Sequence, residues 1–258
     1  MGRMLFDAAT AIGRGQRDYQ EDAVVADFAI GADHGFAVLA DGMGGHAAGD
    51  IASKIVVTEV FGELKLLLGE AERAERDIAG HLSKIAHSAN ECIGAHVETA
   101  REHRGMGATL VAPVIFESRL YWVSIGDSPL YLYRAGQFSQ LNEDHSMAPQ
   151  IDVMMANGLI DRETALNHPD RNCLTSVLMG TDIPRIDCKA EPTQLRPGDV
   201  VVAASDGLPF LPDGRIRAIV HRHRRRPADE IARALMEAVD GLEDPDQDNV
   251  SMAVVKLC

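Results

Sequence analysis

The chain of 258 residues has only four cysteines, and they are irregularly spaced: Cys92, Cys173, Cys188 and Cys258. None belongs to a CxxC pair, and the ten histidines show no HExxH spacing. These absences argue against a zinc site and against a disulfide framework. Few cysteines also fit a reducing compartment, so we expect a cytoplasmic protein.

Long hydrophobic runs are also missing. No apolar run approaches the roughly 20 residues that cross a bilayer, and the amino-terminal stretch lacks the apolar core of a signal peptide. No linker rich in proline, glycine or serine divides the chain, and no internal repeat occurs. Because 46% of the residues are apolar, the chain can bury a substantial core. We expect a single domain over residues 1–258.

Positive charge is scarce, since 25 Lys and Arg face 39 Asp and Glu for a net charge of −14. A surface of this sign repels nucleic-acid backbones and anionic membranes, so we expect neither as a partner. The exception is the run HRHRRR at residues 221–226. It has two interpretations: a solvated loop before a helix that begins at Ala228, or a docking site for an acidic or phosphorylated partner.

Five aspartates stand where apolar or glycine-rich runs end: Asp22, Asp41, Asp127, Asp206 and Asp248. Asp41 follows FAVLA and Asp206 follows VVVAAS, which indicates buried strands that deliver carboxylates to one end. The alternative is an Asp-Gly hairpin turn, which we predict for the pairs at 213–214 and 240–241. Carboxylate oxygens are typical ligands of Mg²⁺ or Mn²⁺.

The hydrophobic pattern predicts mainly antiparallel strands with helices layered on them, an α+β fold. A hairpin of residues 23–28 with 36–40 would bring Asp22 and Asp41 close together. A surface excursion with two short helices is expected over 142–175. The remaining predicted elements are a strand at 7–12, helices at 48–68, 78–100 and 228–239, a strand meander at 107–141, and a last strand that begins after Asp248.

Seven motifs occur in one order along the chain: RDYQEDA at 17–23, DGMGGHAAG at 41–49, MGATL at 106–110, GDSPLYLYR at 126–134, EDHS at 143–146, ASDGL at 204–208 and DNVSMAVV at 248–255. In this order they resemble the metal-dependent protein phosphatases of the protein phosphatase 2C (PPM) family, in its bacterial form. The resemblance implies an α+β sandwich of two antiparallel β-sheets flanked by α-helices, four layers in all. It also implies a binuclear Mn²⁺ or Mg²⁺ centre at one end of the sandwich.

The resemblance also implies residue roles. Asp22 and Asp41 would be metal ligands, with Asp41 at the catalytic centre, and Glu21 would orient a metal-bound water. Arg17 would grip the substrate phosphate, because a guanidinium fork matches phosphate oxygens; the alternative is a surface arginine beside Asp18. The other implied metal ligands are the Gly42 carbonyl, Asp206, Asp248 and, for a third and weaker ion, Asp127.

The sequence departs from the family pattern at two positions. Met43 stands where animal members place a histidine thought to protonate the leaving oxygen, and it cannot carry a proton. The proton donor would then be His46 or a metal-bound water. Pro129 stands where the family commonly has an arginine after GDS, so the geometry around Asp127 is open.

The implied activity is hydrolysis of phosphoserine and phosphothreonine in proteins by a metal-activated water, in a monomer that opposes a serine/threonine kinase. One alternative is a non-catalytic phosphoprotein-binding or regulatory module that keeps the fold. The five aspartates argue against it, because a degenerate site would have lost ligands. The other alternative is a structural Ca²⁺ site, for which a DxDxDG loop is missing.

Overall fold

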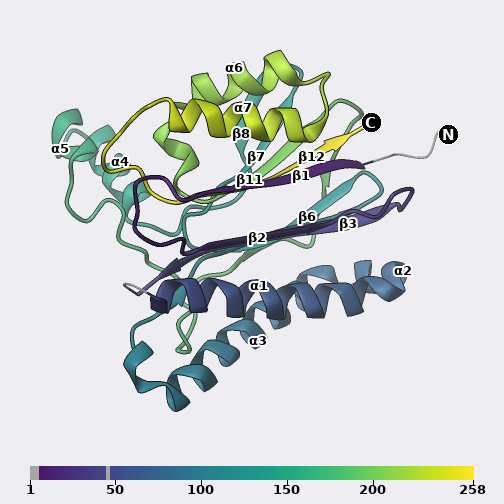
Figure 1. Ribbon diagram of the computed structural model, residues 1–258, viewed down its shortest axis with the longest axis horizontal. Coiled ribbons are helices and arrows are strands. Elements are labelled where there is room, and N and C mark those ends of the chain that lie inside the picture. The colour runs from purple at the N-terminus through teal and green to yellow at the C-terminus, as the bar shows by residue number, and fades with distance from the viewer. Residues whose placement is uncertain (1–5, 45–46) are drawn as a thin grey trace.

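The computed structural model describes residues 6–44 and 47–258. Figure 1 shows four layers: helices α6 and α7, a first sheet with β1 and β12, a second sheet with β2 and β3, and helices α1 and α3. The strands are β1 (Phe6–Gly13), β2 (Asp22–Asp27), β3 (His34–Met43), β4 (Gly107–Ala108), β5 (Leu110–Phe116), β6 (Arg119–Ile125), β7 (Leu130–Arg134), β8 (Gln137–Gln140), β9 (Asp187–Cys188), β10 (Thr193–Gln194), β11 (Val200–Ala204) and β12 (Val250–Leu257). The α-helices are α1 (Ala47–Leu67), α2 (Ala71–Glu75), α3 (Ile78–Thr99), α4 (Ala148–Ala156), α5 (Arg162–Leu166), α6 (Asp213–His223) and α7 (Ala228–Asp240), with short 3₁₀ turns at Leu68–Glu70, Arg101–His103 and Leu208–Phe210.

Both sheets are antiparallel, as predicted. The first has the order β1-β12-β11-β7-β8, and the second has the order β10-β6-β5-β3-β2, with β4 paired to β3 and β9 paired to β6. In the second sheet Asp22 of β2 lies directly opposite Asp41 of β3. The predicted hairpin therefore brings these two carboxylates together.

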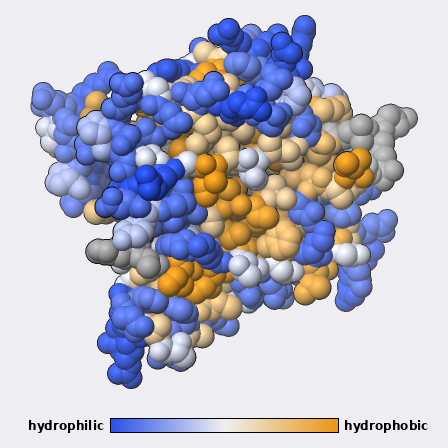
Figure 2. All heavy atoms as spheres, viewed as in Figure 1, coloured by the Kyte–Doolittle hydropathy of each residue, from blue (hydrophilic) through white to orange (hydrophobic). Residues whose placement is uncertain are grey.

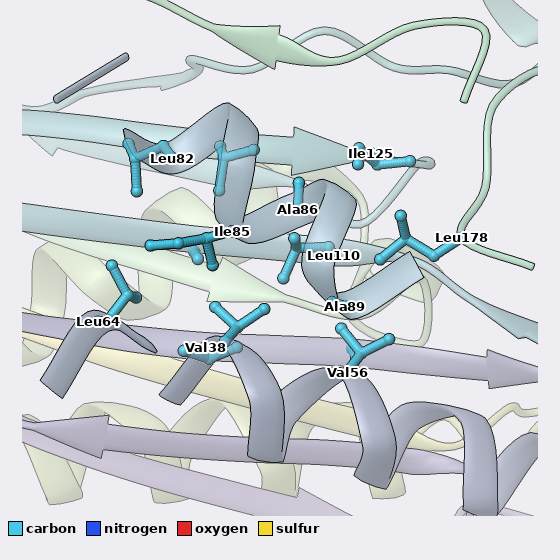
Figure 3. Packing of buried hydrophobic residues seen from close by; sticks show 14 of the residues in the cluster. Val38, Val56, Leu64, Leu82, Ile85, Ala86, Ala89, Leu110, Ile125 and Leu178 are labelled. Atoms are coloured by element: carbon cyan, nitrogen blue, oxygen red, sulfur yellow. The ribbon is translucent and has the colours of Figure 1, made fainter. Parts of the chain in front are cut away.

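The apolar runs of the central strands are continuous because both faces of each sheet are covered. Along β11, Val200 and Val202 pack beneath α6 and α7, whereas Val201 and Ala203 pack between the sheets. On the other side, α1 and α3 cover the second sheet (Figure 3). There Val56 of α1 lies near Val38 of β3 in the same buried cluster. A strand that is buried on both faces is apolar at successive positions and does not alternate between apolar and polar residues.

Helix α6 overturns one prediction and limits another. Asp213 and Gly214 form its first turn, so no hairpin turn occurs there, and residues 221–223 of the basic run form its last turn. Residues 224–227 form the predicted loop before α7, so the loop is confirmed only for the second half of the basic run. Ile216 and Val220 of α6 are buried and Ile219 packs against the same cluster, but most other residues of the helix are charged or histidine. The predicted turn at Asp240 and Gly241 is instead the end of α7. Each Asp-Gly pair therefore marks a helix boundary.

The edge strands β1 and β2 of the two sheets lie side by side on the face shown in Figure 1. In the same view, Figure 2 shows a band of hydrophobic residues across the middle of that face. Ile12 of β1 is 50% exposed there. Among residues 6–44 and 47–258, no helix is long and apolar enough to cross a membrane.

The predicted excursion over residues 142–175 is present and contains the two short helices α4 and α5. Helix α5 begins after Asp161, whose Oδ1 accepts a hydrogen bond from the Thr164 backbone N–H at 2.7 Å. The Asp161 carboxylate satisfies one of the unpaired N–H groups of the first turn. The segment that follows α5 reaches the end of the sandwich where the predicted site lies.

Candidate metal centre

One end of the sandwich gathers the loop and strand ends that carry the predicted acidic residues. Asp206 follows β11 and Asp248 precedes β12, and these strands are antiparallel neighbours in the first sheet. Asp127 lies in the loop between β6 and β7, and this loop is at the same end of the sandwich. A cavity of about 660 Å³ opens between these segments. The predicted site residues that line it are Arg17, Glu21, Asp41, Gly42, Asp127, Asp206 and Asp248.

The neighbours Glu21 and Asp22 point in different directions. Glu21 lines the cavity, whereas Asp22 does not. The Asp22 side chain is buried behind the cavity wall, and its Oδ2 accepts a hydrogen bond from Ser205 Oγ at 2.7 Å. Asp22 lies directly opposite Asp41 in the β2–β3 ladder, so the two side chains lie on the same face of the sheet, and the charge of Asp22 contributes to the raised pKa of Asp41. The structure adds Glu21 to the residues that line the cavity, and the metal-ligand role of Asp22 stays a prediction.

The backbone around Asp41 is held on both sides. Its N–H donates to Thr109 Oγ1 at 2.9 Å, and its carbonyl accepts from the Thr109 N–H at 2.9 Å. The Gly42 N–H donates to the Glu21 carbonyl at 3.1 Å. A Cβ at Gly42 would lie 2.0 Å from the Gly49 carbonyl oxygen, so only glycine fits between β3 and the start of α1. This packing fixes the Gly42 carbonyl at the cavity.

Crowded carboxyl groups at this end have raised pKa values. Burial raises the pKa of Asp22 to about 7, and burial with the charge of Asp206 raises the pKa of Asp127 to about 7. Burial and the charge of Asp248 raise the pKa of Asp206 to about 6. Burial and the same neighbouring carboxylates raise the pKa of Asp41 well above its ordinary value. Acidic groups so placed need protons or cations to share the space.

Three buried carboxylate oxygens at this end of the sandwich have no hydrogen-bond partner among the described residues: Glu21 Oε1, Asp22 Oδ1 and Asp206 Oδ1. Unpartnered carboxylate oxygens in a crowded acidic cavity, next to a fixed backbone carbonyl, form the hard donor set that Mg²⁺ and Mn²⁺ prefer. The residues therefore fit a divalent metal centre. Within residues 6–44 and 47–258, no group of three or more Asp, Glu, His or Cys side chains is close enough together to coordinate one metal ion. The carboxylates share the cavity wall instead.

Arg17 lies at the rim of the cavity. Its Nη2 donates to Asp248 Oδ2 at 2.6 Å, and its side chain is 56% exposed. The guanidinium is thus tethered at one end and accessible from solvent. Arg17 thus pairs with Asp248 at the cavity, and its role in binding the substrate phosphate stays a prediction.

Asn249 is a site residue that the sequence analysis missed. Its Oδ1 accepts from the Glu21 N–H at 2.7 Å, and its Nδ2 donates to the carbonyls of Arg14 and Tyr19 at 2.7 and 2.9 Å. This buried amide ties the segment that carries Arg17 and Glu21 to the start of β12. The only signal in the sequence was its place beside Asp248, which does not reveal partners more than 200 positions away.

The two positions that depart from the family pattern, Met43 and Pro129, both lie close to the cavity residues. Met43 lines the cavity and is 40% exposed, while His46 lies outside the described residues. The loop around Asp127 is held without the missing arginine. Ser128 Oγ lies 2.7 Å from Thr109 Oγ1, and the Pro129 carbonyl accepts from the Ala204 N–H at 3.0 Å. These bonds keep Asp127 at the cavity.

The family model described as protein phosphatase 2C matches residues 14–240. The chain belongs to this family. The resemblance inferred from the seven motifs is thereby confirmed.

Relatives of this phosphatase 2C chain include two bacterial proteins with related names. The serine/threonine phosphatase stp of Listeria innocua is 33% identical over 191 residues, which cover 72% of each protein. The serine/threonine protein phosphatase PstP of Mycobacterium tuberculosis is 34% identical over 174 residues. That match covers 66% of this chain and 31% of the longer PstP.

Solved structures of phosphatases have the same architecture. The Mycobacterium tuberculosis serine/threonine phosphatase PstP/Ppp superposes with a TM-score of 0.78 at 30% identity, over 98% of both chains. A PstP catalytic domain in complex with two manganese ions gives a TM-score of 0.76 at 29% identity, over 98% of this chain and 99% of that one. The predicted sandwich of two antiparallel sheets flanked by helices is confirmed.

Proposed function

We propose that this member of the phosphatase 2C family hydrolyses phosphoserine and phosphothreonine in proteins with the help of divalent metal ions. The observation that carries the proposal is the shared cavity, which is lined by buried carboxylates with raised pKa values and has an accessible arginine at its rim. The names of the relatives as serine/threonine phosphatases support the substrate class.

The residues that would hold two Mn²⁺ or Mg²⁺ ions are those that face the cavity: Glu21, Asp41, the Gly42 carbonyl, Asp206 and Asp248. Asp127, also at the cavity, would hold a third ion. Asp22 would act from behind, by hydrogen bonding to Ser205 next to Asp206. When bound, two divalent ions supply an acidified water and neutralise charge on the attacked phosphoryl group.

Arg17 would bind and orient the substrate. Its guanidinium has donors to spare after the single bond to Asp248, and two parallel N–H groups match the oxygens of a phosphate. A phosphate held at the rim presents its phosphorus to the carboxylate-lined interior.

The leaving oxygen needs a proton, and water would supply it. Among the described residues that line the cavity there is no histidine or lysine, and Met43 has no titratable group. His145 of the EDHS motif is fully buried outside the cavity lining. The cavity is open to solvent at the Arg17 side, so water reaches the leaving group directly.

We further propose that residues 1–258 act as one catalytic domain, as a cytoplasmic monomer that reverses the action of a serine/threonine kinase. The experiment that tests the proposed function is turnover of a phosphothreonine peptide with Mn²⁺ present, with EDTA added, and in the Asp206→Asn variant. We expect activity only in the wild-type protein with Mn²⁺. Activity that persists through chelation and the substitution would exclude the mechanism.

A non-catalytic phosphoprotein-binding module is the alternative, and calorimetry separates the two. The proposal expects saturable Mn²⁺ binding at two or more sites, which the Asp206→Asn variant weakens. A module that only keeps the fold would show no tight metal binding and would bind the phosphothreonine peptide without turning it over.

A further inference from the structure

A second basic feature lies at the opposite end of the sandwich from the metal cavity. Asp199 immediately precedes β11, and Asp206 follows that strand, so the six residues between them separate the two aspartates by roughly 20 Å. Beside Asp199 is a hollow of about 410 Å³ lined by the ends of three separate segments. They are the β7–β8 turn, the turn before β11, and the last turn of α6.

Four arginines line this arginine hollow: Arg134, Arg196, Arg224 and Arg225. One of them is already neutralised. The Arg134 guanidinium donates to both oxygens of the buried Asp199, with the shortest contact at 2.6 Å, and to the Gln194 carbonyl. Asp199 also accepts from the Arg196 backbone N–H at 2.8 Å. Asp199 is the one acidic residue among the described residues that line the hollow, and both of its carboxylate oxygens are hydrogen-bonded.

The other three arginines keep their charge available. Among the described residues, no acidic side chain forms an ion pair with Arg196, Arg224 or Arg225. Arg224 donates one N–H to the His221 carbonyl, which places its guanidinium at the wall of the hollow. In a chain with a net charge of −14, three unpaired arginines around one hollow are a local exception.

Helix electrostatics explain only part of this arrangement. Basic residues in the last turn of α6 are favourable because that end carries negative partial charge. Arg196 does not belong to α6, however, and comes from the turn before β11. The helix dipole of α6 therefore does not explain why Arg196 lines the same hollow as Arg224 and Arg225.

The walls of the hollow are rigid. The Tyr133 hydroxyl lies 2.6 Å from His221 Nδ1 and ties the end of β7 to the end of α6. The two-residue turn after Arg134 places Ala135 at a φ of 49°. At position 135, asparagine or aspartate would tolerate this positive φ better than alanine does, but the side chain of either would place a hydrogen-bond acceptor in the hollow. Alanine at this position adds no acceptor beside the arginines.

We propose that the arginine hollow binds the phosphoryl group of a phosphate ester, at a site separate from the metal cavity. Guanidinium forks from two directions suit the several oxygens of a phosphoryl dianion better than the two of a carboxylate. The group could belong to a free phosphate compound or to a phosphorylated side chain of a protein. In the second case, which rests on the proposed function, the hollow would anchor a multiply phosphorylated substrate while another phosphate is hydrolysed.

The test uses equilibrium binding without catalysis. All proteins carry Arg17→Gln and are kept in EDTA, so that the metal cavity does not contribute and failure of the proposed function cannot affect the result. Inorganic phosphate and a phosphoserine peptide are titrated by calorimetry. The hollow variant is R196Q/R224Q/R225Q, and the matched control is R215Q/R217Q/R222Q, which removes the same charge from exposed positions of α6 outside the hollow.

We expect the hollow variant to bind both probes roughly fivefold to tenfold more weakly, and the control to change binding less than twofold. Thermal unfolding should have the same midpoint in both, since these arginines are exposed or half-exposed. Peptide binding at least tenfold tighter than phosphate binding would indicate a protein-borne phosphoryl group, and equal binding would indicate a free one. No saturable binding in the parent, or equal weakening in both variants, would overturn the proposal.

Discussion

Arg17 connects the acidic cavity to the substrate, so its removal should affect substrate binding and leave the metals in place. We expect Arg17→Gln to lower kcat/KM for a phosphothreonine peptide roughly 30-fold to 100-fold, the cost of about 2 to 3 kcal/mol of charge-assisted hydrogen bonding. Arg17→Lys should recover part of the loss. Steady-state kinetics measure the effect, and unchanged Mn²⁺ affinity is the control. A change within twofold would remove Arg17 from substrate binding.

The opposite directions of Glu21 and Asp22 lead to a paired comparison. Glu21 lines the cavity, whereas Asp22 does not and accepts a hydrogen bond from Ser205 at its Oδ2. Each carboxylate keeps one oxygen without a partner among the described residues, Glu21 Oε1 and Asp22 Oδ1. We expect Glu21→Gln to weaken Mn²⁺ binding at least tenfold and more than Asp22→Asn does. Calorimetric titration of both variants gives the answer. A larger loss from Asp22→Asn would show that the buried aspartate, not the glutamate, contacts the metal.

The Asn249 amide at the start of β12 makes three hydrogen bonds to the segment before β2, in addition to the Arg17–Asp248 ion pair. Asn249→Ala would remove the side-chain hydrogen bonds of three part-buried backbone groups, the Glu21 N–H and the Arg14 and Tyr19 carbonyls. We expect it to lower the free energy of unfolding by about 3 kcal/mol and to reduce turnover by displacing Arg17 and Glu21. Denaturant unfolding measures the loss. Asn157→Ala, at an exposed position, is the control, and equal stability of the two variants would contradict this role.

The strands that build the cavity were predictable because their signals are local. FAVLA before Asp41 and VVVAAS before Asp206 are continuous apolar runs with a glycine after the aspartate, and both become buried strands ending at the site. The pairing of Asp22 with Asp41 followed from a short hairpin. Pattern and length were sufficient here, since both faces of these strands are covered.

Helix α6 was not predictable in the same way. Its sequence DGRIRAIVHRH has a narrow apolar stripe between charged residues, and Asp-Gly at its start is a strong turn signal. Burial of Ile216 and Val220 against the first sheet stabilises the helix, and that contact is not visible in the chain itself. The partners of Asn249 were not predictable for the same reason. Each depends on segments far away in sequence.

Across the whole molecule, the buried carboxyls should make the metal-free protein sensitive to pH. The pKa of Asp22 and that of Asp127 are about 7 in the fold, and that of Asp206 is about 6, against about 3.9 in an unfolded chain. Between about pH 4 and about pH 7 the folded state therefore binds more protons than the unfolded state. The free energy of unfolding must fall as the pH rises through this window.

We expect the melting temperature in EDTA to decrease from about pH 5 to about pH 7.5, and the decrease to be smaller in Asp206→Asn. Excess Mn²⁺ should reverse the trend, because metal binding displaces those protons and strengthens as the pH rises. Differential scanning calorimetry across this range is the measurement. A metal-free protein that becomes more stable toward neutral pH would contradict the crowded acidic cavity.

The central claim is that carboxylates from distant parts of the chain hold two divalent ions in one cavity. Anomalous diffraction from crystals soaked in Mn²⁺ tests it most directly. The account predicts two strong peaks roughly 4 Å apart, in contact with Glu21, Asp41, the Gly42 carbonyl, Asp206 and Asp248. Peaks outside this cavity, or none within it, would contradict the account.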